Sequence, residues 1–561
     1  MTANRTAVRR FRTWSLLFAF LAAEFCCFEW IGAPHYTWLY PRWNDQIQYL
    51  TESYTAYESA RADGWARSLG QTLVNPAAQG TLHDFLALLV FRVTGPSRGA
   101  ALSLNLLHLI AWQIALFVVV RRRFASEALA WVAVALTLCL RIPWTDTQGS
   151  AFDFRLDWMT ACAMGLCLAL ALRTEGFRCA GWSALFGVSV GLTLATRFLT
   201  GVYFILIFAV LLTAVLSREG RWRRMGNLFL AAAAAIAVAG PPMWLNRVWI
   251  SNYYLIGHFT GPESAIRSSH MGVWRSAQWV GSCFLNDHLG TTFLALAGAV
   301  ATVLFGAILV GWFIRRRSGR TEPAPAVMPP AGGDWWVCGL AFALIPAAVL
   351  ILHDLKSAVV ISVVAPGAVV LVVGVLALLL RRAESGFPAA VAQRWAGRLA
   401  AAAIVAAAAF YAARLATDPH DAGFAESARK VNALADQLYD RACAAKLPVT
   451  RVAVDRVTDC LDGQVLKVIC YERHHVWFPF VMTLPTGIAR EPDPSVFLRR
   501  IADSDFVFLT EDGPEGFWPY DHQLRTLLPE NRAWCDAHLR RVERFTLFAN
   551  TMVLYQRREI P

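Results

Sequence analysis

Residues 291–314 read TTFLALAGAVATVLFGAILVGWFI and are followed directly by Arg315-Arg316-Arg317. The run holds no charged residue and exceeds the roughly 20 residues that a helix needs to cross the hydrocarbon core of a bilayer. Because hydrocarbon offers no hydrogen-bond partner to an open backbone, a helix is the expected spanning element. The stretch therefore predicts a transmembrane helix that ends in an arginine cluster.

Similar apolar runs recur along the chain up to about residue 416, in keeping with 56% hydrophobic residues and a mean hydropathy of +0.42. We expect an α-helical polytopic membrane domain of about 11 transmembrane helices over residues 1–416. A small extracytoplasmic α/β domain should follow over residues 417–561. The expected spans are residues 14–33, 99–120, 127–143, 158–172, 181–197, 199–216, 226–246, 291–314, 335–352, 357–380 and 399–416.

Arginines gather in alternate loops between the expected spans, beginning with the N-terminal segment. By the positive-inside rule these loops are cytoplasmic, so an odd number of crossings places the C-terminal domain outside the cytoplasm. We expect a multi-pass protein of the bacterial inner (plasma) membrane. The surplus of 52 basic over 40 acidic residues is then a topology signal, and nucleic acid is not an expected partner. The clusters lie within residues 5–12, 121–123, 173–178, 218–224, 315–320 and 381–398.

The loop of residues 34–98 is expected to face outward, and it reads RWNDQIQYL over residues 42–50. The apolar residues that follow Asp45 have helical spacing, which predicts amphipathic helices lying on the membrane surface. A carboxylate at this boundary can deprotonate a hydroxyl while its reaction partner stays anchored in the bilayer. The alternative is that Asp45 only caps the surface helix.

Further charged residues gather at the ends of the other expected outer loops. Asp153, Arg155 and Asp157 come just before one span. Arg197 and Lys356 stand at outer helix ends, where the positive-inside bias does not predict cations, although snorkelling of a long side chain is the alternative explanation. Several cations around an acidic loop predict a pocket for the phosphate of a lipid.

The order and position of these features resemble the polytopic glycosyltransferases of the GT-C class, which include protein O-mannosyltransferases and aminoarabinose transferases of lipid A. Residues 43–50 resemble the Asp-Asp or Asp-Glu motif in that family's first outer loop, with Gln46 in place of the second acid. Residues 82–89 occupy the place of a Lys-Pro-Pro-Leu-like stretch but lack its lysine and prolines.

Two later segments extend the resemblance. Residues 194–198 are similar to the family's Leu-Thr-Lys-Gly segment, with Arg197 in place of the lysine. Residues 353–356, followed by Pro366 and a long apolar helix, resemble its basic Arg-Tyr-x-x-Pro region. The resemblance thus covers the expected membrane domain.

The resemblance implies transfer, with inversion, of one sugar from a polyprenyl-phosphate donor to a glycan, lipid or protein acceptor on the outer face of the membrane. Asp45 would be the general base. Cations would stabilise the leaving phosphate, so no cofactor is required, a divalent metal is optional and no metal-binding residues are proposed. The candidate residues are Asp45, Asp153 and Asp157 for catalysis, Arg197, Lys356, Arg155 and Arg267 for the donor phosphate, and Gln46, Tyr49, His83 and His353 for the loops that meet the substrates.

Two other classes of protein remain open. A transporter or flippase of a lipid-linked or polar substrate is the main alternative, and the intramembrane Asn105 and His108 favour it. The absence of a clear internal repeat and the clustering of polar residues outside the spans count against it. A membrane-anchored binding protein is the third possibility, although eleven spans exceed what an anchor needs.

The C-terminal domain shows a mixed pattern that predicts a small α/β fold covering the site or binding the acceptor. Its cysteines, if extracytoplasmic, allow three disulfide pairings, and Cys470 with His474 and His475 has poor spacing for zinc. The tail cysteines are Cys443, Cys460, Cys470 and Cys535. The predicted helices lie over residues 422–446, 494–502 and 520–543, and the predicted strands over residues 449–454, 465–470, 506–509 and 551–555.

Overall fold

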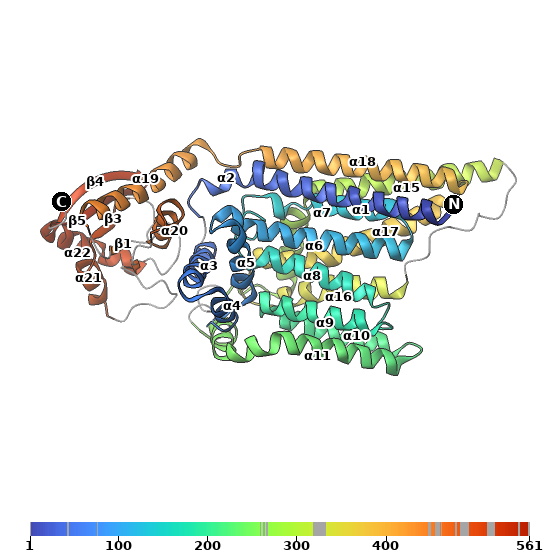
Figure 1. Ribbon diagram of the computed structural model, residues 1–561, viewed down its shortest axis with the longest axis horizontal. Helices are drawn as coiled ribbons and strands as arrows, with labels where there is room; N and C mark the ends of the chain where they lie inside the picture. The colour runs from blue at the N-terminus through green and yellow to red at the C-terminus, as the bar shows by residue number, and fades with distance from the viewer. Residues whose placement is uncertain are drawn as a thin grey trace.

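The computed structural model describes residues 2–41, 44–75, 77–258, 260–261, 264, 268–317, 332–446, 450–454, 461, 463–476, 480–482, 493–512, 522–547 and 550–558. Figure 1 shows a bundle of long helices with a smaller α/β part at one end, which we call the sheet end of the bundle. Three helices, α3 (Asn44–Asp63), α4 (Trp65–Val74) and α5 (Leu82–Thr94), lie between the two parts. They confirm the helices predicted for residues 34–98.

The bundle is apolar and long enough to cross a membrane many times. Eight helical stretches of the described chain have the length and composition of membrane spans, and three shorter apolar helices accompany them. Every predicted span falls on one of these helices, which confirms a multi-pass membrane protein, while the exact number of crossings stays a prediction. The helices are α1 (Thr2–Cys27, continued by α2, Pro34–Thr37), α6 (Arg98–Phe124), α7 (Glu127–Leu138), α8 (Leu156–Arg173), α9 (Ala180–Thr196), α10 (Thr200–Leu216), α11 (Arg221–Leu245), α15 (Gly290–Arg317), α16 (Gly333–Leu352), α17 (Ala365–Glu384) and α18 (Ala389–Ala416).

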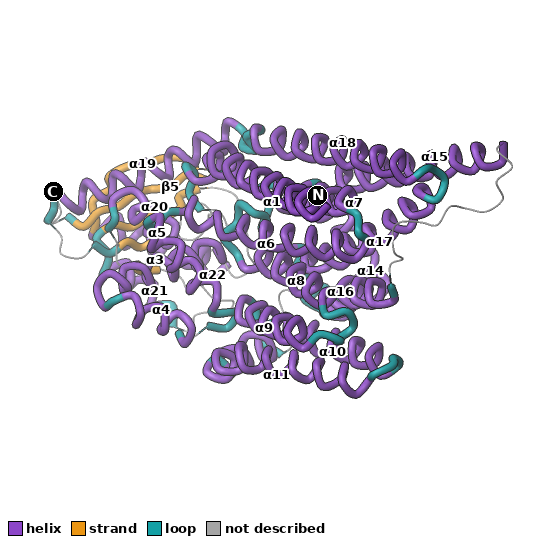
Figure 2. The backbone as a smooth tube through the Cα atoms, turned by 45° about the vertical axis from the view of Figure 1, so that its right-hand side comes forward, coloured by secondary structure: helices purple, strands orange, loops and turns teal. Residues whose placement is uncertain are grey.

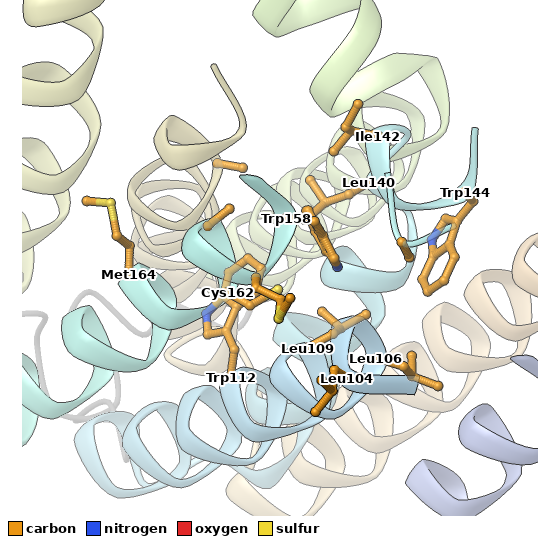
Figure 3. Packing of buried hydrophobic residues seen from close by; sticks show 14 of the residues in the cluster. Leu104, Leu106, Leu109, Trp112, Leu140, Ile142, Trp144, Trp158, Cys162 and Met164 are labelled. Carbon is orange, nitrogen blue, oxygen red and sulfur yellow. The ribbon is translucent and has the colours of Figure 1, made fainter. Parts of the chain in front are cut away.

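Helix α8 lies in the middle of the bundle, where 78% of its apolar stretch is buried, against 22% for α11 at the bundle's edge. It packs on α6, and Figure 3 shows Trp112 of α6 beside Cys162 of α8. The small residue Gly165 makes this approach possible, because a Cβ atom there would lie 2.6 Å from the Trp112 ring. Small residues let helices pack closely where the hydrophobic effect between them is weak. Helix α8, whose first turn carries Asp157, is therefore packed closely against α6.

The α/β part confirms the predicted small mixed domain. Its sheet has the strand order β2-β1-β3-β5-β4, in which β1 is parallel to β2 and β3, and β5 is antiparallel to β3 and β4. The strands lie together in Figure 2, with helices around them. The elements are α19 (Ala422–Ala444), β1 (Val452–Val454), α20 (Gly463–His474), β2 (Phe480–Met482), α21 (Ser495–Ala502), β3 (Phe506–Asp512), α22 (His522–His538), β4 (Leu539–Leu547) and β5 (Asn550–Arg557).

Two predictions for this part were wrong. Residues 465–470 form a turn of α20 and not a strand, because α20 packs against both α19 and α3 and therefore buries an apolar run on several sides. A short apolar run of this kind has no distinguishing period. The helix predicted over residues 520–543 ends at His538, since the following residues pair with β5 as a hairpin strand.

The described tail cysteines form no disulfide. Cys443, Cys470 and Cys535 are all free thiols, and Cys460 lies outside the described residues. Cys470 is buried, and its Sγ atom lies 3.5 Å from the backbone oxygen of Ala435. A free cysteine commonly occupies a buried position of this kind, because its side chain is small and apolar.

The α/β part is docked to the bundle through a largely buried ion pair. Arg98, at the start of α6, donates to Glu472 of α20 at 2.7 Å. The hydroxyl of Tyr54 on α3 donates to the same carboxylate at 2.7 Å, and the hydroxyl of Tyr471 donates to Glu58 of α3. Each of the two helices α3 and α20 thus donates one hydroxyl hydrogen bond to a carboxylate of the other.

Replacing Glu472 by Ala should destabilise this docking. Breaking a buried pair leaves an uncompensated charge, here Arg98, at a cost of about 3–5 kcal/mol. The melting temperature should fall and proteases should cleave near residue 417 more rapidly. The matched control is Arg473→Ala, which removes the exposed pair with Asp436 and should cost no more than about 1 kcal/mol. Equal effects of the two substitutions would contradict the docking role of Glu472.

Candidate active site at the sheet end of the bundle

Asp45 lies in the first turn of α3, facing the loop that precedes α8. Its Oδ2 atom accepts a hydrogen bond from Nη2 of Arg155. The Asp45 side chain remains 41% exposed, and its second oxygen has no hydrogen-bond partner among the described residues. Arg42 and Trp43 of the same motif lie outside the described residues. Asp45 is therefore oriented on one side by a cation and open on the other.

Arg155 is shared by three carboxylates, Asp45, Asp153 and Asp157, which we call the carboxylate cluster. The Nε atom of Arg155 lies 3.6 Å from Oδ2 of Asp157 and 3.8 Å from Oδ2 of Asp153. Burial alone would lower the pKa of Arg155, but the three carboxylates together raise that pKa above its ordinary value. Arg155 is thus a permanent cation.

Asp153 is the most deeply buried member of the carboxylate cluster. Its Oδ2 atom accepts a hydrogen bond from the backbone N–H of Gly149 at 2.6 Å, while its Oδ1 atom has no partner among the described residues. Burial raises the pKa of Asp153 to about 8, against the opposing effect of Arg155. Asn105 of α6 fixes this loop by donating to the backbone oxygens of Ala151 and Asp153, each at 2.9 Å.

A second ion pair continues the row of charges. Asp157, in the first turn of α8, binds Arg197, which follows the last residue of α9. Burial opposes the charge of Arg197, but Asp157 and nearby tyrosines raise its pKa above the ordinary value. The Asp157 side chain is buried, and that of Arg197 is 14% exposed. Asp45, Arg155, Asp157 and Arg197 therefore form an alternating row of acid and base.

A close backbone approach fixes Arg197 beside the helices of residues 34–98. The backbone N–H of Thr81 donates to the oxygen of Ala195 at 2.8 Å, and that of Phe198 donates to the oxygen of Gln79 at 2.7 Å. Between these bonds, a Cβ atom at Gly80 would lie 2.0 Å from the backbone oxygen of Thr196. Only glycine fits there.

The predicted substrate-loop residues Gln46, Tyr49 and His83 are buried. The Oε1 atom of Gln46 accepts a hydrogen bond from the backbone N–H of Phe154 at 3.2 Å. This bond ties α3 to the loop that precedes α8. The ring of His83 lies between those of Tyr49 and Phe154, with centroid distances of 5.0 and 4.1 Å. These contacts tie α3 and α5 to the loop that carries Asp153 and Arg155.

Gln79, which the sequence pattern did not single out, connects the site to the later loop of residues 247–290. The hydroxyl of Tyr49 donates to Oε1 of Gln79 at 2.6 Å, and Nε2 of Gln79 donates to the hydroxyl of Tyr253 at 3.2 Å. Burial raises the pKa of Tyr49 well above its ordinary value, so the phenol is a neutral donor. A glutamine in a loop carries no sequence signal for such a bridge.

His353 and Lys356 follow the end of α16, and His353 contacts the loop of residues 247–290. The His353 ring is 5.6 Å from that of His258, whose ring is in turn 5.5 Å from that of Tyr254 near Arg197. The ammonium group of Lys356 donates to three backbone oxygens at the end of α16, at 2.5 to 3.1 Å, and burial lowers its pKa. Phosphate binding by Lys356 stays a prediction that requires it to release one of these bonds. Arg267 lies outside the described residues.

The buried Asp153 predicts a pH dependence of stability. Between its ordinary pKa of 3.8 and its folded pKa of about 8, the folded chain holds one proton more than the unfolded chain. The free energy of unfolding should therefore fall as pH rises through this window, by at most about 1.4 kcal/mol per pH unit. Asp153→Asn, which mimics the protonated acid, should remove this contribution, as melting temperatures from pH 5 to 8 will show. An unchanged slope would contradict a protonated Asp153, and the exposed Asp63→Asn is the matched control.

No protein-family model matches the sequence, and no curated protein matches it either. Two crystal structures of ArnT from Cupriavidus metallidurans are similar along the whole chain. The one bound to undecaprenyl phosphate has a TM-score of 0.60 and 13% identity, covering 96% of this chain and 98% of ArnT. The apo structure has a TM-score of 0.60 and 14% identity, covering 99% and 98%.

A third similar structure is the archaeal oligosaccharyltransferase AglB from Archaeoglobus fulgidus, in complex with an inhibitory peptide and a dolichol-phosphate. Its TM-score is 0.47 at 11% identity, covering 97% of this chain and 74% of AglB. The coverage of ArnT includes both the helical bundle and the α/β part, so the likeness extends to the architecture as a whole. The chain therefore has the fold of ArnT, that of the GT-C membrane glycosyltransferases.

Proposed function

We propose that the protein transfers a sugar from a polyprenyl-phosphate donor to a hydroxyl group of an acceptor at the outer face of the membrane, with inversion. The observation that supports this most is the row of charges that joins Asp45 to Arg197 at the sheet end of an apolar bundle. A donor whose lipid tail stays in the bilayer presents its sugar at the end of the bundle, where this row of charges lies. ArnT, which shares the fold, was solved with undecaprenyl phosphate bound.

In the proposed reaction, the open oxygen of Asp45 removes the proton of the acceptor hydroxyl. The acceptor oxygen forms a bond to the anomeric carbon, the bond from that carbon to the phosphate oxygen breaks, and its electron pair leaves with polyprenyl phosphate. Arg197, with Arg155 behind it, stabilises the growing charge on that phosphate. Proton transfer contributes about 10²–10⁴-fold to such rates, and electrostatic stabilisation is often the larger effect.

Exposure separates the roles of the three carboxylates. Asp45 is 41% exposed and reaches an incoming hydroxyl, whereas Asp153 and Asp157 are buried. Asp157 is occupied by Arg197, and Asp153 is protonated near neutral pH. We assign Asp157 and Asp153 to the positioning of the two arginines, and Asp45 alone to proton abstraction.

The orientation of the chain is part of the proposal. Arginine clusters of the expected inner loops, such as residues 121–123 and 381–382, lie at helix ends. With these ends in the cytoplasm, Asp45 and the α/β part lie outside it. The acceptor then approaches Asp45 from the aqueous side, beside α3 and the docked α/β part.

The proposal is tested with the purified protein in liposomes. Labelled sugars are offered on polyprenyl phosphates, and the same sugars on nucleoside diphosphates serve as controls. The label should move to a hydroxyl-bearing acceptor and polyprenyl phosphate should be released, with lipid-linked donors only. Movement of intact donor across the bilayer without transfer from any lipid-linked donor would contradict a transferase and favour a flippase.

A further inference from the structure

A groove lies at the end of the bundle opposite the sheet end, between α1, α7 and α18. The N-terminus of α1 marks this end in Figure 1. We call this space, whose walls include Arg12, Glu384 and Gly397, the far-end groove, and its volume is about 720 Å³. Ligand-binding pockets commonly measure about 300–1,000 Å³. Neither the proposed reaction nor the docking of the α/β part uses this groove.

The far-end groove exists because α1 stands away from the two helices beside it. Helix α7 packs closely on α18, whereas α1 makes few close backbone contacts with either. Side chains connect α1 to α7 instead, since the hydroxyl of Thr13 donates to Oε1 of Glu127 at 2.9 Å. The ring of Phe20 meets that of Trp131 edge-on at 5.8 Å. On α18, a Cβ atom added to Gly397 would meet no atom within 4 Å, so the described side chains leave the space open.

The far-end groove is polar at its mouth and apolar farther in. Helices α1 and α18 both run from this end toward the sheet end. Arg12 therefore lies at the mouth, with Leu16 and Phe20 deeper along α1. Gln393 precedes Ile404 along α18 in the same way. This order matches a membrane lipid, whose headgroup stays at the interface while its chains lie in the hydrocarbon core.

The charges of the far-end groove narrow the choice of headgroup. Within the described part of the chain, its charged lining residues are Arg12, Glu127 and Glu384. The Oε2 atom of Glu384 is buried and has no hydrogen-bond partner among the described residues. A buried carboxylate oxygen without a donor is costly, so Glu384 suits a ligand that brings N–H groups. Arg12 suits a phosphate.

We propose that the far-end groove binds one phospholipid whose headgroup carries both a phosphate and a primary ammonium group, as in phosphatidylethanolamine. The ammonium group donates to Glu384, the phosphate accepts from Arg12, and the acyl chains lie along the apolar wall that begins at Leu16. With the orientation given under the proposed function, the lipid belongs to the cytoplasmic leaflet. Its binding does not depend on sugar transfer.

Other membrane lipids fit these charges less well. Phosphatidylglycerol has a phosphate but no ammonium group, so it leaves Glu384 without a donor and adds a negative charge beside two acids. The quaternary ammonium group of phosphatidylcholine has no N–H group to donate, whereas a primary ammonium group has three. Polyprenyl phosphate lacks an ammonium group altogether. Hydrogen bonds to charged groups are the stronger ones, so these differences should be measurable as selectivity.

Native mass spectrometry of the purified, delipidated full-length protein tests the selectivity. Phosphatidylethanolamine, phosphatidylglycerol and phosphatidylcholine with the same acyl chains are added separately in detergent. One phosphatidylethanolamine should bind per chain, about tenfold or more tightly than the other two lipids. Equal binding of the three lipids would overturn the proposal. Displacement of phosphatidylethanolamine by an equal concentration of polyprenyl phosphate would overturn it as well.

A substitution that fills the far-end groove shows where the lipid binds. Gly397→Trp places a large side chain in the groove without a backbone clash, and should weaken phosphatidylethanolamine binding about tenfold or more. The matched control is Gly298→Trp on α15, where an added Cβ atom also meets nothing within 4 Å and the groove is not touched. It should bind the lipid as the wild type does. Unchanged binding by a folded Gly397→Trp would contradict the site.

A second, independent variant tests the ammonium contact. Glu384→Gln keeps the shape of the side chain but removes its charge, so the preference for phosphatidylethanolamine over phosphatidylcholine should fall to within a few-fold. Glu219→Gln, an exposed glutamate just before α11, is the matched control and should keep the preference. An unchanged preference in Glu384→Gln would overturn the ammonium assignment. Lipid binding is the readout throughout, so these results hold whether or not the protein transfers sugar.

Discussion

Asp45→Asn lowers the rate of sugar transfer by about 10²–10⁴-fold in our account, with the protein's abundance and melting temperature little changed. The amide oxygen still accepts the hydrogen bond from Arg155, but the amide group takes no proton from an acceptor hydroxyl. Transfer is measured as labelled product per unit time at saturating donor, in liposomes.

The matched control is Asp63→Asn, at the opposite end of the same helix α3, where the side chain is exposed. It removes the same charge from the same helix without touching the carboxylate cluster, and should leave the rate within a few-fold of the wild type. If Asp45→Asn transferred sugar as fast as Asp63→Asn, Asp45 would not be the general base.

The second large effect is expected for Arg197→Gln, which removes a largely buried cation proposed to stabilise the leaving phosphate. The rate at saturating donor should fall by about 10²–10³-fold, because the interaction strengthens as charge moves onto the phosphate. Steady-state kinetics distinguish the loss of transition-state stabilisation from weaker binding of the donor. A raised KM with unchanged kcat would mean that Arg197 only binds the donor.

Loss of Arg197 also leaves Asp157 without its ion-pair partner, so folding needs its own control. The double variant Asp157→Asn with Arg197→Gln removes both charges and should recover thermal stability without recovering transfer. Arg247→Gln, an exposed arginine stacked on Trp244, is the matched control for the loss of a cation near the membrane boundary. Recovery of transfer in the double variant would show that Arg197 acts only by neutralising Asp157.

The bundle was predictable because its signal is local. A run such as residues 291–314 has the length and the lack of charge that a spanning helix requires, and no distant contact alters that requirement. The helices after Asp45 were predictable in the same way, from the helical spacing of their apolar residues. By contrast, residues 465–470 gained their helix from packing on both α19 and α3, which no local pattern expresses.

The candidate site was predictable as a set of residues but not as a geometry. Position at helix ends marked Asp45, Arg155 and Arg197, since charge there has a cost that function can justify. Spacing along the chain does not reveal that Arg155 reaches Asp45 across 110 residues. It also does not reveal that Gln79 bridges Tyr49 to Tyr253, because a neutral loop side chain resembles any other.

Stereochemistry tests the role of Asp45 most directly. A polyprenyl-phosphate sugar of known anomeric configuration is turned over once by the wild type, and the configuration of the new bond is determined by nuclear magnetic resonance. Direct attack by an acceptor that Asp45 deprotonates predicts the opposite configuration in the product. A retained configuration would contradict the account, because it requires a nucleophile and a covalent intermediate in place of a base.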